Sequence, residues 1–229
     1  MKTIGLIGGM SWESTIPYYR QINDLIKVRL GGLHSAKLVL YSVDFHDIER
    51  MQRDGDWDAA GAMLAEAGQA LERAGADFLV LCTNTMHKVA GDIEAAVSIP
   101  LLHIADPTAE AITGTGKRTV GLLGTRFTME QDFYRERLEQ HGLSVITPSE
   151  DDREIIHRII FDELCLGYIR GSSREEYRRI MASLADEGAE AIILGCTEIS
   201  LLVDSTDSRV PLFDTMTLHA RRAAERALD

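Results

Sequence analysis

Residues 190–198 read Glu-Ala-Ile-Ile-Leu-Gly-Cys-Thr-Glu, and this stretch decides the fold that the sequence predicts. Its run of apolar residues, preceded by a polar turn, indicates a buried strand of a parallel sheet. The strand ends at Gly195, and Cys196 follows it directly. Because open α/β sheets bind ligands beyond the carboxyl ends of their strands, Cys196 is a candidate functional residue.

An earlier segment repeats this pattern. Residues 74–85 align with residues 187–198 without a gap, glycine on glycine and strand on strand. In this alignment the partner of Cys196 is Thr83, whereas Cys82 lies one position earlier. The two strand ends therefore carry different side chains at the matched position.

Two further pairs of segments match in the same order. Residues 118–124 resemble residues 2–8, and residues 210–213 resemble residues 99–102. A single match can arise by chance, because strand–glycine–helix units recur in any α/β protein. Three matches in one order favour an internal duplication. We therefore predict an α/β fold of two similar parallel-sheet halves, with the active site in the cleft between them.

The matched segments also set the expected domain boundaries. The first half is predicted to comprise residues 1–102 together with 213–229, and the second half residues 103–212. Apolar residues at helical spacing predict helices between most of the strands. A polar loop is predicted after the second strand, where the chain carries Asp44, His46, Arg50, Gln52 and Arg53.

Composition narrows the class of partner. The chain of 229 residues is 45% hydrophobic and has a formal net charge of −12, which argues against nucleic-acid and anionic-membrane partners. No apolar run reaches the roughly 18 residues of a membrane span, and the N-terminal apolar run is too short for a signal peptide. Three cysteines without CxxC spacing indicate reduced thiols and a cytoplasmic location.

Several common chemistries are not supported. The glycines Gly5, Gly8 and Gly9 lack the spacing of the dinucleotide fingerprint, and Tyr41 stands in the second strand where that fingerprint needs an acidic residue. The histidines show no zinc-ligand spacing, and no G-x-S-x-G elbow is present. We therefore expect no cofactor and no metal site.

The loops after the two matched strands are suited to an anion. Residues 83–85 and 196–198 each lie between a strand end and a helix start, where backbone N–H groups lack helical partners. Asn84, Thr85 and Thr197 add side-chain donors, so a carboxylate is a natural occupant. Helix capping is the alternative explanation for each of these residues taken singly.

The cysteines differ in expected reactivity. A thiol at a helix N-terminus has a lowered pKa, and Cys196 fits this description. Cys165 lies at the end of a helix and is expected to be an inert core or lining residue. Cys82 is expected to point away from the face that Thr83 occupies, because successive strand residues alternate. His87 lies one turn after Thr83 and either tunes it or is a surface histidine.

At these positions the chain resembles the aspartate/glutamate racemase family over nearly its whole length. The resemblance implies two similar α/β halves, amino-acid racemase activity without pyridoxal phosphate, and a homodimer. It also implies that Thr83 and Cys196 occupy the positions where most members carry a cysteine in each half. The resemblance is carried by three motifs: Gly8-Gly9-Met10, Asn84-Thr85-Met86-His87 and Gly195-Cys196-Thr197-Glu198.

The threonine in place of a cysteine predicts an enzyme whose two proton-transfer groups differ in chemistry. Racemisation needs one group that removes the Cα proton and another that returns a proton to the opposite face. Our hypothesis is that Cys196 acts as a thiolate base on the L-enantiomer, while Thr83, through His87 or water, protonates the other face. The L-to-D direction would then be faster. The alternative is that a bulge turns Cys82 inward as the second thiol.

L-aspartate and L-glutamate are the expected substrates. Cys165 occupies the place where relatives specific for these acids carry a basic residue, so the side-chain carboxylate must be recognised elsewhere, with Gln52 and the 124–128 loop with Arg126 as candidates. The alternatives are a broad-specificity racemase, a related cysteine-dependent isomerase or decarboxylase of small carboxylic acids, and a non-catalytic two-lobed binding protein. The predicted substrate-binding residues are Met10, Ser11, Gln52, Asn84, Thr85, Thr125, Thr128, Thr197 and Glu198.

Overall fold

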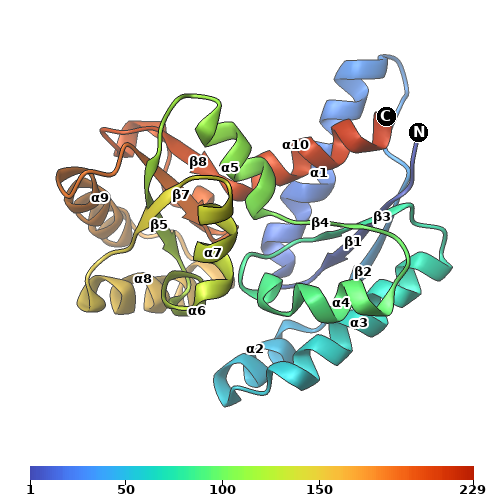
Figure 1. The fold of residues 1–229 in the computed structure, drawn as a ribbon, viewed down its shortest axis with the longest axis horizontal. Coiled ribbons are helices and arrows are strands. Elements are labelled where there is room, and N and C mark those ends of the chain that lie inside the picture. Colours follow the sequence, from blue (N-terminus) through green and yellow to red (C-terminus); the bar gives the residue numbers. More distant parts are fainter. The chain divides into compact units, whose positions relative to one another are not determined.

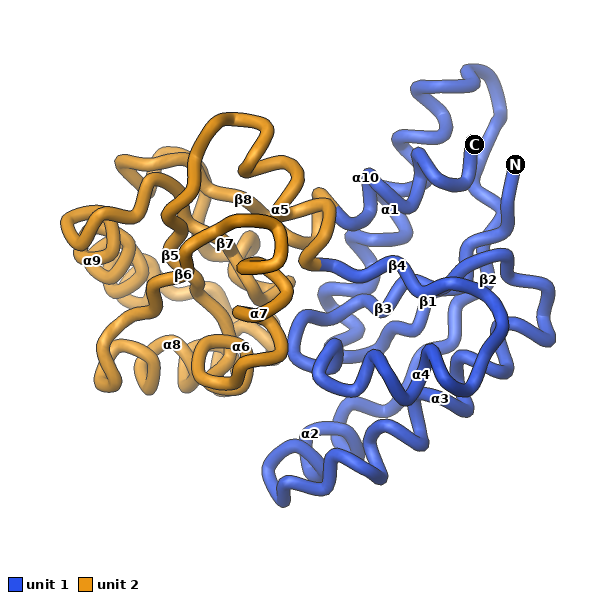
Figure 2. Tube along the Cα trace, viewed as in Figure 1, with its two compact units in different colours: residues 1–104, 219–229 blue, residues 105–218 orange.

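The computed structural model describes residues 1–229. The chain divides into two compact units, residues 1–104 with 219–229 and residues 105–218 (Figure 2). Each unit contains a four-stranded parallel sheet with helices packed against it (Figure 1). These two sheets confirm the predicted α/β fold of two similar halves.

The strand order is the same in both units. It is β2-β1-β3-β4 in the first unit and β6-β5-β7-β8 in the second, with all neighbours parallel. In the first unit the strands are β1 (Ile4–Gly8), β2 (Leu38–Ser42), β3 (Phe78–Leu81) and β4 (Leu101–Leu102). In the second unit they are β5 (Thr119–Gly124), β6 (Ser144–Ile146), β7 (Ala191–Gly195) and β8 (Leu212–Asp214).

Helices connect the strands in the right order for parallel pairing. The first unit contains α1 (Trp12–Leu30), α2 (Phe45–Asp54), α3 (Trp57–Arg73), the 3₁₀ turn η1 (Thr85–Val89), α4 (Ala90–Ala96) and most of α10 (Thr215–Leu228). The second unit contains α5 (Ala105–Thr113), α6 (Arg126–Glu130), α7 (Asp132–Gln140), α8 (Glu150–Asp162), α9 (Gly171–Asp186) and the 3₁₀ turns η2 (Leu164–Leu166), η3 (Ile199–Leu201) and η4 (Ser205–Asp207).

The strand register repeats between the units at the positions that matter for the site. Ile7 of β1 pairs with Leu81 of β3, and Leu123 of β5 pairs with Leu194 of β7. Leu81 and Leu194 are therefore equivalent, as the sequence alignment requires. Two residues beyond each of them lie Thr83 and Cys196, so register and alignment agree on this pair.

Matched glycines let a helix approach each sheet closely. A Cβ added at Gly5 would lie 2.9 Å from the Ala76 and Leu79 side chains, and one added at Gly121 would lie 2.7 Å from Ile192. Any side chain at these positions would push α3 or α9 away from the strand it covers. Because both helices precede the strand with the candidate site, these glycines fix where each strand end lies.

The segment from Asp44 to Arg53 is a helix, α2, and the prediction of a polar loop is wrong. Asp44 caps its start by accepting a hydrogen bond from the backbone N–H of His46, and Gly55 ends it in a left-handed conformation. Only Ile48 and Gln52, one turn apart, are buried on it. Partly buried Phe45 and Met51 pack with Ile48 in one apolar cluster, so α2 has an apolar face at i, i+3 and i+6. The charged residues between these positions conceal that face in the sequence, and the capping residues were the clearer signal.

Candidate functional site

Cys196 follows β7 and lies on the face of the sheet that α8 and α9 cover. It belongs to the same apolar cluster as Ile192 and Leu194, as strand alternation requires, and is 7% exposed. Its Sγ donates a hydrogen bond to Glu198 Oε2 at 3.0 Å. The Thr197 hydroxyl donates to the same oxygen at 2.8 Å. One carboxylate oxygen therefore faces both the thiol and a hydroxyl.

The expected lowering of the Cys196 pKa is wrong. Burial raises this pKa well above its ordinary value, and the charges of Glu198 and Cys165 raise it further, while the backbone amide of Glu198 acts in the opposite direction. The turn that follows, η3, has only three residues, so it lacks the aligned peptide dipoles of an α-helix. The resting residue is a neutral thiol hydrogen-bonded to a carboxylate.

Tyr177 of α9 is a neighbour of this thiol that the sequence analysis did not identify. Its side chain is fully buried in the same apolar cluster, and its hydroxyl has no hydrogen-bond partner. Burial raises the pKa of Tyr177 well above its ordinary value, followed by the charges of Cys196, Cys165, Glu198 and Glu163. In the sequence it reads as an ordinary aromatic residue on the buried face of a helix.

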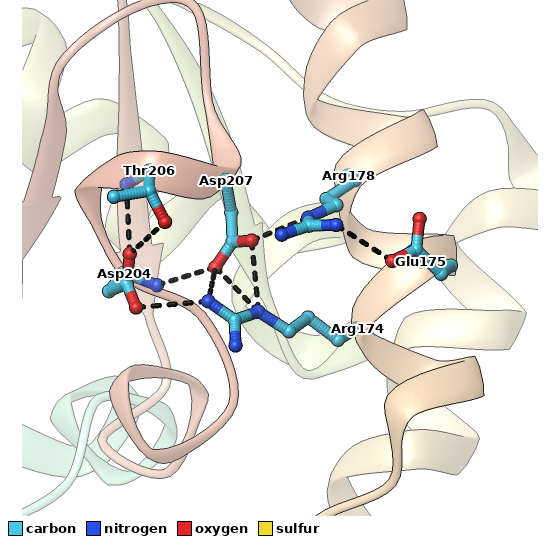
Figure 3. A network of polar contacts seen from close by, with 6 residues as sticks. All are labelled: Arg174, Glu175, Arg178, Asp204, Thr206 and Asp207. Carbon is cyan, nitrogen blue, oxygen red and sulfur yellow. Dashed lines mark hydrogen bonds and ion pairs between the residues drawn. The ribbon is translucent and has the colours of Figure 1, made fainter.

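An ion-pair network holds the loop that follows Cys196 against α9 (Figure 3). Asp207, whose side chain is inaccessible to solvent, accepts hydrogen bonds from Arg174 Nε at 2.9 Å and from Arg178 Nε at 2.5 Å. Asp204 accepts from Arg174 Nη2 at 2.9 Å and donates its backbone N–H to Asp207. The Arg174 side chain contributes most to holding the pKa of Asp207 down, at about 2.

A threonine of the loop after β5 caps the helix that follows it. Thr125 caps α6 by accepting a hydrogen bond from the backbone N–H of Thr128, and both threonines are buried. Arg126 is paired with Glu154 at 2.6 Å and both side chains are largely exposed. Thr125 and Thr128 therefore shape the loop, and Arg126 already has a carboxylate partner.

Thr83 occupies the equivalent of Cys196 in the first unit. It is 6% exposed and lies two residues after Leu81 on the strand. Cys82, in contrast, is fully buried in the core, with its Sγ 3.8 Å from the Val80 carbonyl oxygen, and burial raises its pKa. The β1–β3 pairing is regular up to Leu81, and beyond it the Thr83 N–H donates to the Leu81 carbonyl oxygen at 2.9 Å. The Cys82 side chain stays in the core, so the alternative of an inward-turned Cys82 is not what the structure has.

His87 anchors the backbone of Thr83. Its Nδ1 lies 2.7 Å from the Thr83 carbonyl oxygen, and its Nε2 accepts a hydrogen bond from the Ile104 N–H at 3.2 Å. These two contacts require the tautomer with the proton on Nδ1, which donates to the carbonyl. The ring is buried, so the surface interpretation is wrong. Its contact to Thr83 is to the carbonyl oxygen, which differs from the relay to the hydroxyl that the sequence suggested.

The other predicted residues of the first unit are buried next to strand ends. Gly9 has φ +93°, and a Cβ at this position would clash with the Val43 carbonyl oxygen, so only glycine fits. Its N–H donates to Thr15 Oγ1 at 2.9 Å. The Thr15 hydroxyl in turn donates to the Ser11 carbonyl at 2.9 Å. Burial extends to every predicted substrate-binding residue of this unit: Met10, Ser11, Gln52, Asn84 and Thr85.

Some of these residues are brought together in pairs. Gln52 donates from Nε2 to the Met86 sulfur at 2.9 Å, which ties α2 to the turn after β3. Asn84 and Thr85 begin η1, and the Asn84 carbonyl accepts the His87 N–H at 3.1 Å. Gln52 is thus fixed by a side-chain contact to the turn that follows Thr83. None of the helices combines the length and apolar character that a membrane span requires.

Comparison with known proteins places the chain in a family. A model of the family Asp/Glu/Hydantoin racemase matches residues 7–223. The broad specificity amino-acid racemase RacX of Bacillus subtilis is 25% identical over 95% of each chain. Two crystal structures cover all of both chains: a candidate Asp/Glu racemase from Yersinia pestis (60% identity, TM-score 0.93) and an aspartate racemase homologue from Pyrococcus horikoshii (38%, 0.85).

The matched region spans both loops that follow the strands β3 and β7. It also agrees with the three motifs from which the sequence resemblance was drawn. The chain belongs to the Asp/Glu/Hydantoin racemase family and is an isomerase, an amino-acid racemase.

Proposed function

We propose that the protein racemises L-aspartate and L-glutamate without pyridoxal phosphate, with Cys196 removing the Cα proton and Thr83 returning a proton to the opposite face. The observation that carries the proposal is the 3.0 Å hydrogen bond from the Cys196 thiol to Glu198. A buried thiol is a poor base until it loses its proton, and this carboxylate is placed to receive it.

The first half of the reaction conserves charge within the site. Glu198 takes the thiol proton, which leaves a thiolate and a carboxylic acid that together carry one negative charge. The thiolate then takes the Cα proton: the C–H bond breaks, the S–H bond forms, and the electron pair stays on the substrate, delocalised into its carboxylate. Backbone N–H groups of the strand-end loops would stabilise this charge.

The second half depends on Thr83. Its hydroxyl gives a proton to the carbanion from the other face and takes one back from water. Glu198 then releases to the resulting hydroxide the proton that it took from Cys196, which restores the starting carboxylate, thiol and hydroxyl. The His87 contact to the Thr83 carbonyl supports this role because it fixes the backbone from which the hydroxyl projects. A threonine alkoxide is a far stronger base than a thiolate and forms far less readily, so proton abstraction from the D-enantiomer should be slow. The Cα proton of the L-enantiomer should therefore exchange with solvent faster than that of the D-enantiomer.

The test follows the Cα proton of pure L- and D-aspartate in deuterated water. The L-enantiomer should lose its Cα proton faster, Cys196→Ala should abolish that loss, and Thr83→Ala should slow the appearance of the D-enantiomer. Cys82→Ala is the matched control and should retain exchange. Equal initial rates for both enantiomers, or exchange by Cys196→Ala, would contradict the proposed roles.

A broad-specificity racemase is the second candidate. The similarity to RacX favours it. So does the shortage of cations for an acidic side chain, because Arg126 is already paired with Glu154 and Cys165 stands where a basic residue was expected. A panel of L-amino acids in the same exchange assay separates the two: exchange confined to the acidic substrates supports the first candidate. Maleate-like acids in the panel test the isomerase or decarboxylase alternative. Family membership sets aside the non-catalytic binding protein.

We also propose a cytoplasmic homodimer formed through the edge of the first unit. Strand β2 is an edge strand, so its outer N–H and C=O groups are unpaired in the sheet. Beside it the helix α1 exposes Trp12, Ile16 and Tyr19, which with Leu40 line a groove. A second copy fits this surface because two β2 strands paired antiparallel about a two-fold axis are self-complementary.

A further inference from the structure

The unpartnered hydroxyl of Tyr177 is the one buried side-chain oxygen or nitrogen in the chain without a hydrogen-bond partner. A buried polar group without a partner is costly, and a phenylalanine of the same shape would avoid that cost. The hydroxyl therefore needs a reason beyond packing. It belongs to the apolar cluster that also contains Cys196, and the charge of Cys196 is the largest electrostatic influence on it.

The ion-pair network of Figure 3 holds Tyr177 in this position. Arg174, Tyr177 and Arg178 lie at successive i, i+3 and i+4 positions of α9, which share one face of a helix. The two arginines bind Asp207 in the loop that follows Cys196 (Figure 3). The face of α9 that bears Tyr177 is thus clamped to the same loop that carries the thiol.

We propose that Tyr177 is a positioning residue for the thiolate of Cys196, and that its hydroxyl donates a hydrogen bond to the sulfur once Glu198 has taken the thiol proton. In the resting state the sulfur is protonated and donates to Glu198, so it attracts a second donor only weakly. The thiolate is a strong acceptor, and the burial of the site makes a neutral donor more valuable there than in water.

Tyr177 keeps its own proton throughout the reaction. Ionisation of its buried hydroxyl is opposed by burial and by the charges of Cys196, Cys165, Glu198 and Glu163. It therefore acts as a donor and not as an acid or a base. No bond to its proton breaks, and the transfers from Cys196 to Glu198 and from Cα to the sulfur stay balanced without it. This role rests on the proposed function of Cys196.

The experiment measures the thiolate without any substrate. Tyr177→Phe removes only the hydroxyl, and Tyr134→Phe, at another fully buried tyrosine of the same unit, is the matched control. The rate of alkylation of Cys196 by iodoacetamide, read on its own peptide by mass spectrometry, follows the thiolate fraction at a fixed pH. One hydrogen bond to a charged group corresponds to a fall in that fraction of roughly tenfold.

The alkylation rate of Tyr177→Phe should be about threefold lower and not tenfold lower, because a thiolate of higher pKa is intrinsically more nucleophilic and offsets part of the loss. kcat for the L-substrate should fall about tenfold with KM unchanged, and the thermal midpoint should not fall. An unchanged alkylation rate overturns the proposal. So does a misfolded or less stable Tyr177→Phe beside a normal Tyr134→Phe, because the hydroxyl would then have a structural partner. Since alkylation needs no substrate, a protein without racemase activity still tests Tyr177.

Discussion

Glu198 acts on the Cys196 thiol in two opposite ways. Its carboxylate raises the pKa of the thiol by charge and by accepting its proton, whereas its backbone amide lowers that pKa. The carboxylate thus favours the neutral thiol at rest, and in the proposed mechanism it also receives the thiol proton. A buried thiolate with no such partner would carry an uncompensated desolvation cost.

Glu198→Gln should therefore change the pH dependence of proton exchange from L-aspartate. At neutral pH the variant lacks the proton acceptor, and the rate should fall by about 100-fold. Removing the carboxylate also lowers the Cys196 pKa, so the thiolate of the variant forms at lower pH than that of the unmodified protein. The loss should therefore shrink as pH rises. The measurement is the exchange rate across neutral and alkaline pH, and a loss of equal size at every pH would contradict the mechanism.

At the scale of the element, ion pairs join helix α9 to the loop after β7. Asp207 joins them through two guanidinium groups, and the η4 turn that holds it is closed by a capping box between Asp204 and Asp207. The corresponding loop of the first unit is held differently, by the ring of His87. Two equivalent strand ends are thus fixed by unrelated contacts, because the duplicated halves have diverged outside their sheets.

Asp207→Asn should make the second unit less stable above about pH 4. The folded pKa of Asp207, about 2, lies below its ordinary value of 3.8, so its stabilisation is present above 3.8 and is lost as pH falls through 2. We expect a loss of ~1 kcal/mol, because the arginine side chains are 35% and 42% exposed and solvent screens the pairs.

Urea unfolding of Asp207→Asn at two pH values checks this prediction. The difference between variant and unmodified protein should be present at pH 7 and should diminish toward pH 2. Asp186→Asn is the matched control, because the Asp186 ion pair with Arg209 is 71% and 62% exposed and should contribute little. Equal losses of unfolding free energy in the two variants would show that the buried carboxylate contributes no more than an exposed one.

At the scale of the whole molecule, one group of exposed apolar residues lines a groove on the first unit. Trp12, Ile16 and Tyr19 of α1 are 59%, 48% and 54% exposed, and Leu40 on the edge strand is 42% exposed. Together they form a connected groove, which isolated exposed apolar residues would not do. A second copy would cover these side chains and pair the free edge of β2.

Ile16→Glu should dissociate the dimer. A charge placed in a buried contact at an anchor residue costs about 2 kcal/mol or more, which corresponds to a dissociation constant roughly 30-fold weaker. Sedimentation velocity over a range of protein concentrations measures the change. Val28→Glu is the control, because Val28 lies on the same helix, is 80% exposed and lies outside the groove. A monomeric unmodified protein would refute the interface.

The sequence determined the repeated α/β halves and the pairing of Thr83 with Cys196. Both are encoded locally: strand residues alternate between faces, and the glycines and apolar runs recur in one order. The tertiary structure decided the rest. Helix α2 escaped prediction because charged residues separate the three apolar residues that pack on the core, Phe45, Ile48 and Met51. The protonation state of Cys196 and the isolated hydroxyl of Tyr177 depend on burial and on charges from α9 and the loop after β7, which are distant in sequence. Local sequence patterns cannot predict these effects, because desolvation depends on which segments pack around a side chain in the folded molecule.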